Sequence, residues 1–321
     1  MKVVLVTGAA GFIGSNAAEA LLKNYPSIRV IGLDNFDPTY PVAFKRSNIG
    51  GLKKSAQFSF YEADIRDRTA LRRIFKKEQP DAVLHLAAKA DTRHAVVAPQ
   101  EYVDTNITGT LNLLECAKEF QVKRFVFASS SSVYGNDNTA PFKEDAVTDH
   151  AISPYGASKK AGEGLAYTYH HNFGLSVVCI RIFNAYGERM RPGLVLYTWV
   201  EKILKGETIE ISGKGTRRRD YTYIGDLVDA LLRVLTKKNI GFLVVNIGNA
   251  GSVSLTHMLR TVERATGKKA RVVSRPSHHA SVERTHASIA KAKRILDWKP
   301  KTSFQDGVER FVEWYQSERG S

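Results

Sequence analysis

The first half of the chain alternates between short, almost entirely apolar runs and longer segments in which apolar residues recur every three or four positions. Near-continuous runs of β-branched residues, such as VVLVT, are typical of strands buried on both faces of a parallel sheet. The longer segments have the period of amphipathic helices. Six strands are expected here: Lys2–Thr7, Arg29–Leu33, Phe58–Glu62, Ala82–Leu86, Arg124–Ala128 and Leu175–Phe183. The alternation predicts an α/β fold built on a doubly wound parallel sheet.

A glycine-rich turn joins the first expected strand to the first expected helix. Gly8, Gly11 and Gly14 are spaced three residues apart, and Asp34 follows the second strand, twenty residues after Gly14. Backbone N–H groups at such a turn point toward a bound pyrophosphate, and the helix dipole favours its negative charge. A carboxylate at the position of Asp34 binds the ribose hydroxyls of NAD and repels the 2′-phosphate of NADP. The chain is therefore predicted to bind NAD.

A tyrosine and a lysine share one face of a helix that follows the fifth strand. Ser153 and Pro154 predict the start of this helix, and Tyr155 and Lys159 lie four residues apart within it. None of the other tyrosines is followed by lysine at that spacing. A nearby ammonium is expected to lower the pKa of the phenol and so to make it usable for proton transfer. Alone, the pair is typical of a solvated helix surface; beside a dinucleotide site we interpret it as catalytic.

After Phe183 the alternation becomes irregular. A helix is expected around residues 194–206 and a short strand at Ile209–Ser212, and Arg217, Arg218 and Arg219 follow in a loop. Guanidinium groups bind phosphate oxygens through two hydrogen bonds, so these arginines suit a diphosphate; the alternative is an exposed basic turn. We predict an NAD-binding domain at residues 1–183 and a smaller mixed α/β substrate-binding domain at residues 184–321. Parts of residues 221–247 are expected to return to the first sheet.

Composition adds few constraints. The formal net charge is +15, but the lysines and arginines are scattered over expected helix surfaces, so no specific nucleic-acid partner is predicted. Cys116 and Cys179 lie in apolar segments and are expected to be buried thiols. The chain shows no signal-peptide pattern and no apolar run of membrane-spanning length, so a cytoplasmic protein without a membrane partner is expected. No acid or cysteine completes a metal set with the histidines at 278, 279 and 286.

Eight motifs carry a resemblance to a known family. TGAAGFIGS, Asp34-Asn35, DIRD, HLAA, SSSSVYG, SPYGASK, RIFNAYG and RRDYTYIGD occur in the order found in the extended short-chain dehydrogenase/reductases. Over nearly its whole length the chain resembles the nucleotide-sugar 4-epimerases of the UDP-glucose and UDP-glucuronate kinds. The resemblance implies that Tyr155 is the catalytic base, that Lys159 holds the nicotinamide ribose, and that Ser130 binds the sugar 4-oxygen. It also implies a homodimer formed through the helices around 104–120 and 156–172.

The same resemblance implies two sets of binding residues. The cofactor-binding residues would be Gly8, Gly11, Phe12, Ile13, Gly14, Asp34, Asn35, Asp64, Ile65, Leu86, Ala87, Ala88, Asn106, Tyr155 and Lys159. The substrate-binding residues would be Ser130, Tyr155, Asn184, Arg191, Arg219 and Thr285. At two positions where relatives often carry an arginine and an aspartate that contact the nucleotide, this chain has His278 and Ser281.

The serine run indicates the type of reaction. The 4,6-dehydratases place acids in this motif and the UDP-glucuronate decarboxylases place a glutamate just before VYG, whereas this chain has Ser132 there. Without that acid the simplest chemistry is reversible oxidation at C4 of a UDP-sugar. Tyr155 would take the hydroxyl proton and NAD⁺ the hydride, and the 4-keto sugar would turn over before the hydride returns to its other face.

The choice of sugar depends on two residues that point to different branches. Asn184 resembles the UDP-glucose branch, and Arg191 matches an arginine of the uronate-acting branch. We expect the neutral pair, UDP-glucose and UDP-galactose, because Asn184 lies in the more rigid segment. The alternatives are UDP-glucuronate with UDP-galacturonate, then a UDP-N-acetylhexosamine 4-epimerase or a UDP-glucuronate decarboxylase. The alternative outside enzymes is an NAD-binding sensor or an RNA-associated protein.

Overall fold

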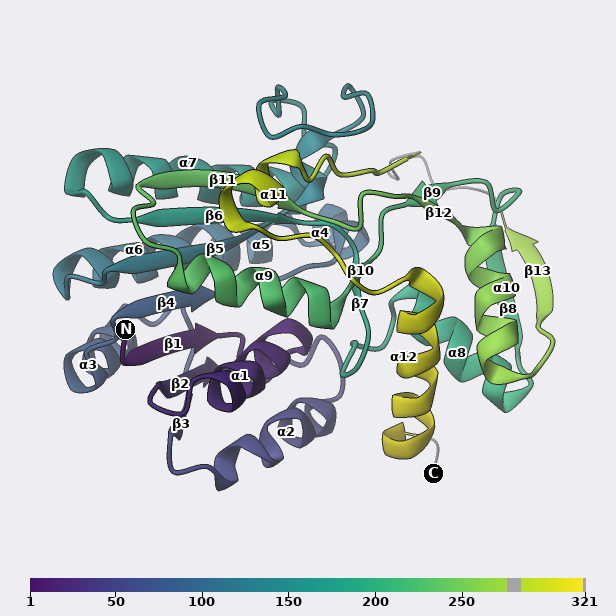
Figure 1. Cartoon of the computed structure of the whole chain (residues 1–321), viewed down its shortest axis with the longest axis horizontal. Helices are drawn as coiled ribbons and strands as arrows, with labels where there is room; N and C mark the ends of the chain where they lie inside the picture. The colour runs from purple at the N-terminus through teal and green to yellow at the C-terminus, as the bar shows by residue number, and fades with distance from the viewer. Residues whose placement is uncertain (276–283, 320–321) are drawn as a thin grey trace.

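The computed structural model describes residues 1–275 and 284–319 (Figure 1). Its centre is a seven-stranded sheet in the order β11-β6-β5-β4-β1-β2-β3, with every neighbouring pair parallel. The doubly wound α/β fold expected from the sequence is confirmed. The strands of this sheet are β1 (Val3–Thr7), β2 (Arg29–Asp34), β3 (Phe58–Glu62), β4 (Ala82–His85), β5 (Arg124–Ser130), β6 (Val177–Ile182) and β11 (Phe242–Ile247).

Helices cover both faces of the sheet because successive strand residues point to opposite sides. In β1, Val4 and Val6 pack into the apolar cluster under one set of helices, and Leu5 packs into the cluster under the other set. The first set comprises α1 (Phe12–Asn24), α2 (Val42–Gly50), α9 (Ile224–Thr236) and α11 (Ala290–Leu296). The second set comprises α3 (Arg68–Glu78), α6 (Gly109–Glu119) and α7 (Pro154–Phe173), with the short α4 (Thr92–Val97) and α5 (Pro99–Tyr102) packed against α7.

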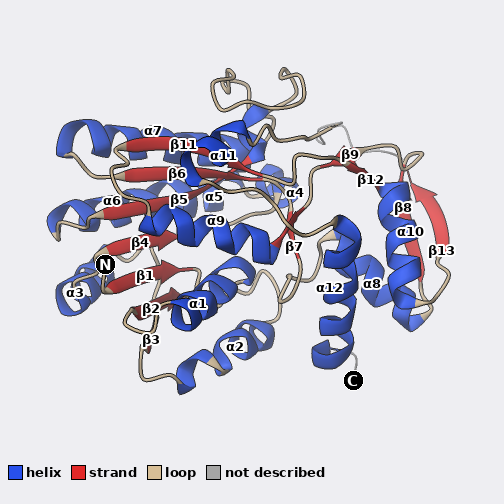
Figure 2. Cartoon of the chain, viewed as in Figure 1, coloured by secondary structure: helices blue, strands red, loops and turns tan. Residues whose placement is uncertain are grey.

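A smaller part lies beyond the carboxyl ends of the sheet strands (Figures 1 and 2). Its helices α8 (Val195–Lys205) and α12 (Phe304–Arg319) both pack against α10 (Leu255–Thr266). Three two-stranded pairs complete it: β7 (Ala185–Tyr186) with β10 (Thr222–Tyr223), β9 (Arg218–Arg219) with β12 (Val253–Ser254), and β8 (Thr208–Ser212) with β13 (Arg271–Arg275). The ligand-binding edge of the sheet is therefore walled by a second layer of structure.

The chain returns to the large sheet after the smaller part has begun. β11 pairs with β6 in parallel register, and α9 packs against α1. α11, which the sequence pattern did not assign to the sheet, packs against β11. The division at residue 183 stays a prediction, since the chain crosses between the two parts more than once.

One expected helix is interrupted. The helix expected around residues 104–120 belongs to a longer helical run that is divided into α5, a π-helical segment at Val103–Thr108, and α6. Within the π segment the Asn106 side chain accepts a hydrogen bond from Lys89 N–H at 2.9 Å and donates one to the Lys89 carbonyl at 3.0 Å. The π-helical turn is therefore stabilised by hydrogen bonds to a loop that is distant in the sequence, and the pattern of apolar residues along the helix does not reveal them.

Short 3₁₀ turns occur at Leu52–Lys54 and Ser131–Tyr134. Cys116 and Cys179 are free and buried, as predicted. In the described ranges, no helix combines the length and apolarity that a membrane crossing requires.

Candidate active site

A cavity of about 500 Å³ opens along the carboxyl edge of the large sheet, where β1 and β4 lie side by side without being consecutive in the chain. Ligand sites in doubly wound sheets lie at such a reversal of strand order. Most of the lining comes from the loops after β1, β2, β3, β4, β5 and β6, from the start of α7 and from residues between 190 and 196. Seventeen predicted site residues line it: Gly8, Gly11, Phe12, Ile13, Gly14, Asp34, Asn35, Asp64, Ile65, Leu86, Ala87, Ala88, Ser130, Tyr155, Lys159, Asn184 and Arg191.

The glycine turn is too tight for side chains. Gly8 has φ of +67°, and a Cβ on it would lie 2.9 Å from the Ala87 nitrogen. A Cβ on Gly14 would lie 2.0 Å from the Gly8 carbonyl oxygen. The turn therefore presents bare backbone at the N-terminus of α1, which is the cradle that a dinucleotide pyrophosphate requires.

Asp34 ends β2 next to this turn. Its Oδ2 accepts a hydrogen bond from Ala10 N–H at 3.1 Å, and its Oδ1 accepts one from Phe36 N–H at 2.9 Å. Burial raises the pKa of this carboxyl, while Lys45 Nζ, 3.9 Å from Oδ1, opposes the rise. Asp34 is thus fixed at the cavity wall with lone pairs left for ribose hydroxyls.

A buried polar chain holds the loop that follows β4. The Thr110 hydroxyl donates to the Asn106 carbonyl at 2.5 Å, so it accepts at 2.9 Å from Nε2–H of His85. His85 Nδ1 then accepts from the Thr7 hydroxyl at 2.8 Å, and the Thr7 oxygen accepts from the N–H groups of residues 86 and 87, both at 3.2 Å. Burial lowers the pKa of His85 to about 3, so the ring is neutral and keeps this tautomer.

Two more of the expected cofactor-binding residues, Asn35 and Asp64, are hydrogen-bonded to each other. Asn35 Nδ2 donates to Asp64 Oδ2 at 2.8 Å. The Arg66 guanidinium, 2.7 Å from the same oxygen, is the main reason that the pKa of Asp64 falls to about 2. Asn106, by contrast, does not line the cavity: it bonds to the Lys89 backbone and to the Ser158 hydroxyl at 2.9 Å. It supports the loop that lines the cavity.

Tyr155 lies at the start of α7, as the capping signal predicted. The Ser153 hydroxyl accepts a hydrogen bond from Gly156 N–H at 3.1 Å and caps the helix. The Tyr155 ring packs edge-on against Tyr102, with ring centroids 6.4 Å apart. Burial raises the pKa of Tyr155 above its usual value, while a hydrogen bond with Ser130 and the charge of Arg191 act in the opposite direction.

Lys159 is buried on the same helix as Tyr155. Its Nζ donates to the Ala128 carbonyl at 2.8 Å, and burial lowers the pKa of Lys159 to about 7. The groups that lower the pKa of Tyr155 in this arrangement are Ser130 and Arg191, and a contribution of Lys159 stays a prediction. Both side chains nevertheless line the same cavity, one helical turn apart on α7.

Ser130 ends β5 on a rigid support. Its Oγ accepts from Ser132 N–H at 3.1 Å. Directly before it, the Ser129 hydroxyl donates to Glu163 Oε1 at 2.6 Å, and Glu163 forms a buried ion pair with Arg181 at 2.8 Å. The pair ties β5 and β6 to α7, so Ser130 and Tyr155 are held in fixed positions relative to each other.

The expected substrate residues are only partly brought together. Asn184 lines the cavity, and its Nδ2 lies 3.0 Å from the Asp220 carbonyl and 3.5 Å from the Thr285 hydroxyl. Thr285 is buried behind Asn184 and does not line the cavity. Arg219 lies in β9, also away from the lining. His278 and Ser281 lie outside the described residues.

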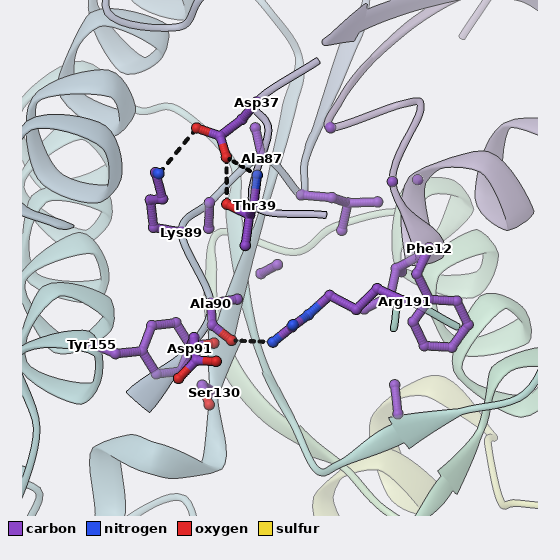
Figure 3. A pocket seen from close by; sticks show the side chains of 18 of the residues that line it. Phe12, Asp37, Thr39, Ala87, Lys89, Ala90, Asp91, Ser130, Tyr155 and Arg191 are labelled. Carbon is purple, nitrogen blue, oxygen red and sulfur yellow. Dashed lines mark hydrogen bonds and ion pairs between the residues drawn. The ribbon is translucent and has the colours of Figure 1, made fainter. Parts of the chain in front are cut away.

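Arg191 is a cation within the cavity itself (Figure 3). Its Nη2 donates to the Ala90 carbonyl at 3.1 Å. Two further groups that the sequence analysis missed lie nearby: Asp91 lines the cavity, and Lys89 pairs with Asp37 at 3.0 Å across it. The only sequence signal for them was that they directly follow the HLAA motif at a strand end.

The parallel sheet has the strand order of a dinucleotide-binding fold, and its cavity is lined by the glycine-rich turn and by Ser130, Tyr155 and Lys159. These features define a short-chain dehydrogenase/reductase of the extended type. The chain matches the family model described as GDP-mannose 4,6 dehydratase over residues 5–311. It belongs to that family, and the predicted place among the nucleotide-sugar 4-epimerases is confirmed.

Three relatives illustrate the similarity. A UDP-glucuronate 4-epimerase from Thermodesulfobacterium geofontis is 42% identical over 315 residues, which cover 98% of this chain and 96% of the relative. The structure of UDP-glucuronic acid 4-epimerase from Bacillus cereus, in complex with UDP-glucuronic acid and NAD, has a TM-score of 0.92 and 36% identity, covering 98% of this chain and 99% of that one. UDP-glucose 4-epimerase from Thermotoga maritima, with UDP-glucose, has a TM-score of 0.90 and 32% identity, with the same coverage.

Proposed function

We propose that this NAD-dependent UDP-sugar 4-epimerase interconverts UDP-glucuronate and UDP-galacturonate. The observation that carries the choice of sugar is the position of Arg191, whose guanidinium projects into the cavity on the side of Ser130 and Tyr155 (Figure 3). Its hydrogen bonds are to backbone carbonyls, Ala90 at 3.1 Å and Pro192 at 3.5 Å. A sugar carboxylate offers a stronger, charge-assisted partner than either carbonyl.

The neutral pair, UDP-glucose and UDP-galactose, was the expected substrate, and it is not confirmed. The uronate alternative fits the relatives better, because the curated and solved proteins with high similarity include UDP-glucuronate 4-epimerases. The expectation relied on Asn184, but the Asn184 amide is already bonded to the Asp220 carbonyl at 3.0 Å. The Asn184 side chain is therefore partly engaged within the protein, and its resemblance to the UDP-glucose branch carries less weight than the position of Arg191.

The side chains of the site suit a proton transfer at O4 of the sugar. Ser130 and Tyr155 both line the cavity, and Ser130 acts to lower the pKa of Tyr155, so a hydroxyl placed between the two side chains can donate its proton to Tyr155 while Ser130 fixes its oxygen. Because burial raises the pKa of Tyr155, its deprotonation needs positive charge close by, and Arg191 supplies part of it. Lys159, with a pKa of about 7, is able to exchange a proton near neutral pH.

NAD⁺, when bound, would supply the hydride acceptor and return the hydride after the 4-keto sugar has turned over. The residues that would hold it are the Gly8–Gly14 turn, Asp34 and the loop at Leu86–Ala88. The crowded glycine contacts and the fixed carboxylate of Asp34 fit such a cofactor.

The direct experiment is mass spectrometry and NMR of the products after incubation with a panel of UDP-sugars. We expect UDP-glucuronate to give an isomer of unchanged mass. Arg191→Ala should lower kcat/KM for UDP-glucuronate by roughly 30-fold, which corresponds to a loss of about 2 kcal/mol in transition-state stabilisation, the value of a charged hydrogen bond. UDP-glucose should lose little from that change. An equal loss on both sugars would mean that Arg191 does not read the carboxylate.

A further inference from the structure

The sugar end of the cavity carries a carboxylate as well as a guanidinium. Asp91 lines the cavity directly after Ala90, whose carbonyl accepts the hydrogen bond from Arg191 Nη2 at 3.1 Å. In Figure 3 the Arg191 side chain reaches across the cavity to Ala90, and Asp91, Tyr155 and Ser130 lie beyond its tip. A positive and a negative group therefore share the place where the sugar of the proposed substrate would react.

Asp91 is held firmly, but through one carboxylate oxygen. Its Oδ1 accepts hydrogen bonds from Arg93 N–H at 2.8 Å and His94 N–H at 3.0 Å and so caps α4. Its backbone is fixed by Tyr102, whose hydroxyl donates to the Asp91 carbonyl at 2.7 Å and accepts from Asp91 N–H at 3.3 Å. Within the described residues, 1–275 and 284–319, the Asp91 Oδ2 atom forms no hydrogen bond or ion pair. One oxygen of a rigid carboxylate is thus left over from the capping role.

The carboxylate is charged at neutral pH. Burial raises the pKa of Asp91, but the two capping hydrogen bonds and the charges of Arg191 and Arg93 outweigh it and hold the pKa below its usual range. The neighbouring cation Lys89 is engaged with Asp37 at 3.0 Å and Glu101 at 2.8 Å. Arg191 is therefore the cavity cation whose charge Asp91 chiefly offsets.

We propose that Asp91 is a specificity-determining residue that limits the preference of the site for an anionic sugar over a neutral one. The inference rests on the proposed function. A sugar carboxylate that draws Arg191 from the Ala90 carbonyl comes close to the negative charge of Asp91, whereas a neutral hydroxymethyl group meets no such repulsion.

Asp91→Asn tests the proposal with little disturbance of α4. Asparagine is as good a helix cap as aspartate. Its side-chain oxygen can accept from the N–H groups of Arg93 and His94, and its uncharged NH₂ group then occupies the position of Oδ2. Equilibrium binding is measured by calorimetry with the NAD-loaded protein, in a Tyr155→Phe background that slows turnover by roughly 10²-fold. The quantity compared is the ratio of the Kd for UDP-glucose to the Kd for UDP-glucuronate.

We expect Asp91→Asn to raise this ratio about tenfold, the order of one partly buried charge interaction. Asp91→Ser, which also caps a helix, should raise it in the same direction and replaces the asparagine variant if that one fails to fold. The control is Asp67→Asn, because Asp67 caps α3 by accepting from Ala70 N–H at 2.9 Å and does not line the cavity. That control should leave the ratio unchanged.

An unchanged or lowered ratio in both Asp91 variants would overturn the proposal. Failure of the proposed function is seen separately, since it would appear as no conversion of UDP-glucuronate by the unmodified enzyme. The binding ratio is still measurable in that case, so the two failures are distinguishable.

Discussion

Asp34 is the residue on which we expect the choice of cofactor to depend. Its two oxygens are anchored by Ala10 and Phe36 N–H groups, and it lies at the cavity wall at the end of β2. Asp34→Ala should weaken NAD binding by roughly tenfold or more, the value of a charged hydrogen bond, and narrow the preference over NADP. Fluorescence titration of the apoprotein with NAD and with NADP measures both dissociation constants.

Asp34→Asn serves as the companion variant, because it keeps one acceptor for the turn and removes the charge. It should therefore lose less affinity for NAD than the alanine variant but discriminate equally poorly against NADP. Equal affinity of the unmodified protein for both cofactors would contradict the role given to Asp34.

His85 makes stability depend on pH. In the folded chain its pKa is about 3, against about 6.5 when unfolded, so below pH 6.5 the unfolded state takes up a proton that the folded state does not. This contribution to stability is complete at neutral pH and is lost as the pH falls from about 6.5 toward 3. Between pH 6.5 and 5 the loss should approach about 1.5 kcal/mol, to be measured by urea unfolding.

The comparison for this prediction is His85→Gln, which has no proton to take up. The unmodified chain should lose more stability on acidification than this variant, while His171→Gln, at an exposed position on α7, should behave like the unmodified chain. Parallel pH curves for His85→Gln and the unmodified chain would show that His85 is not the source.

At the scale of elements, α7 carries Tyr155 and Lys159 and packs closely against β5. A Cβ on Gly162 would lie 2.3 Å from Phe127 Cζ, whereas a Cβ on Gly164 meets nothing within 4 Å. Gly162→Ala should therefore destabilise the protein by about 1–3 kcal/mol through overpacking. Gly164→Ala should stabilise it by about 0.5–1 kcal/mol, since alanine lowers the entropy of the unfolded chain.

Thermal and urea unfolding of the two variants give the result directly. If both substitutions shift the free energy of unfolding in the same direction, α7 does not pack against β5 as closely at Gly162 as the distance to Phe127 indicates.

The elements also show what local patterns predict and what they do not. The bounds of β3 match the predicted Phe58–Glu62, because aromatic residues interspersed with polar ones between two turns are typical of a half-buried strand. The π segment and the indirect role of Asn106 were not predictable, since both depend on hydrogen bonds to a loop seventeen residues earlier. Thr285 and Arg219 likewise match motif positions, yet the tertiary arrangement places them behind the cavity wall or away from it.

At the scale of the whole molecule, a homodimer through α6 and α7 remains a prediction. The two helices pack together, and Leu111 on α6 and Tyr167 on α7 are exposed apolar residues. Light scattering after size exclusion should show a dimer for the unmodified chain and a monomer for Leu111→Glu, because a buried charge without a partner disfavours the interface. Val147→Glu, at an exposed loop position, is the control and should stay dimeric.

The central claim is that the chain oxidises and reduces C4 of UDP-glucuronate through Tyr155. The measurement is NMR and mass spectrometry of UDP-glucuronate that carries deuterium at C4, incubated with the NAD-loaded enzyme. The account predicts a mixture of UDP-glucuronate and UDP-galacturonate of unchanged mass, with the deuterium retained at C4 of both. Tyr155→Phe should form this mixture roughly 10²-fold more slowly. Loss of CO₂ or water, loss of the deuterium to solvent, or an undiminished rate in Tyr155→Phe would contradict it.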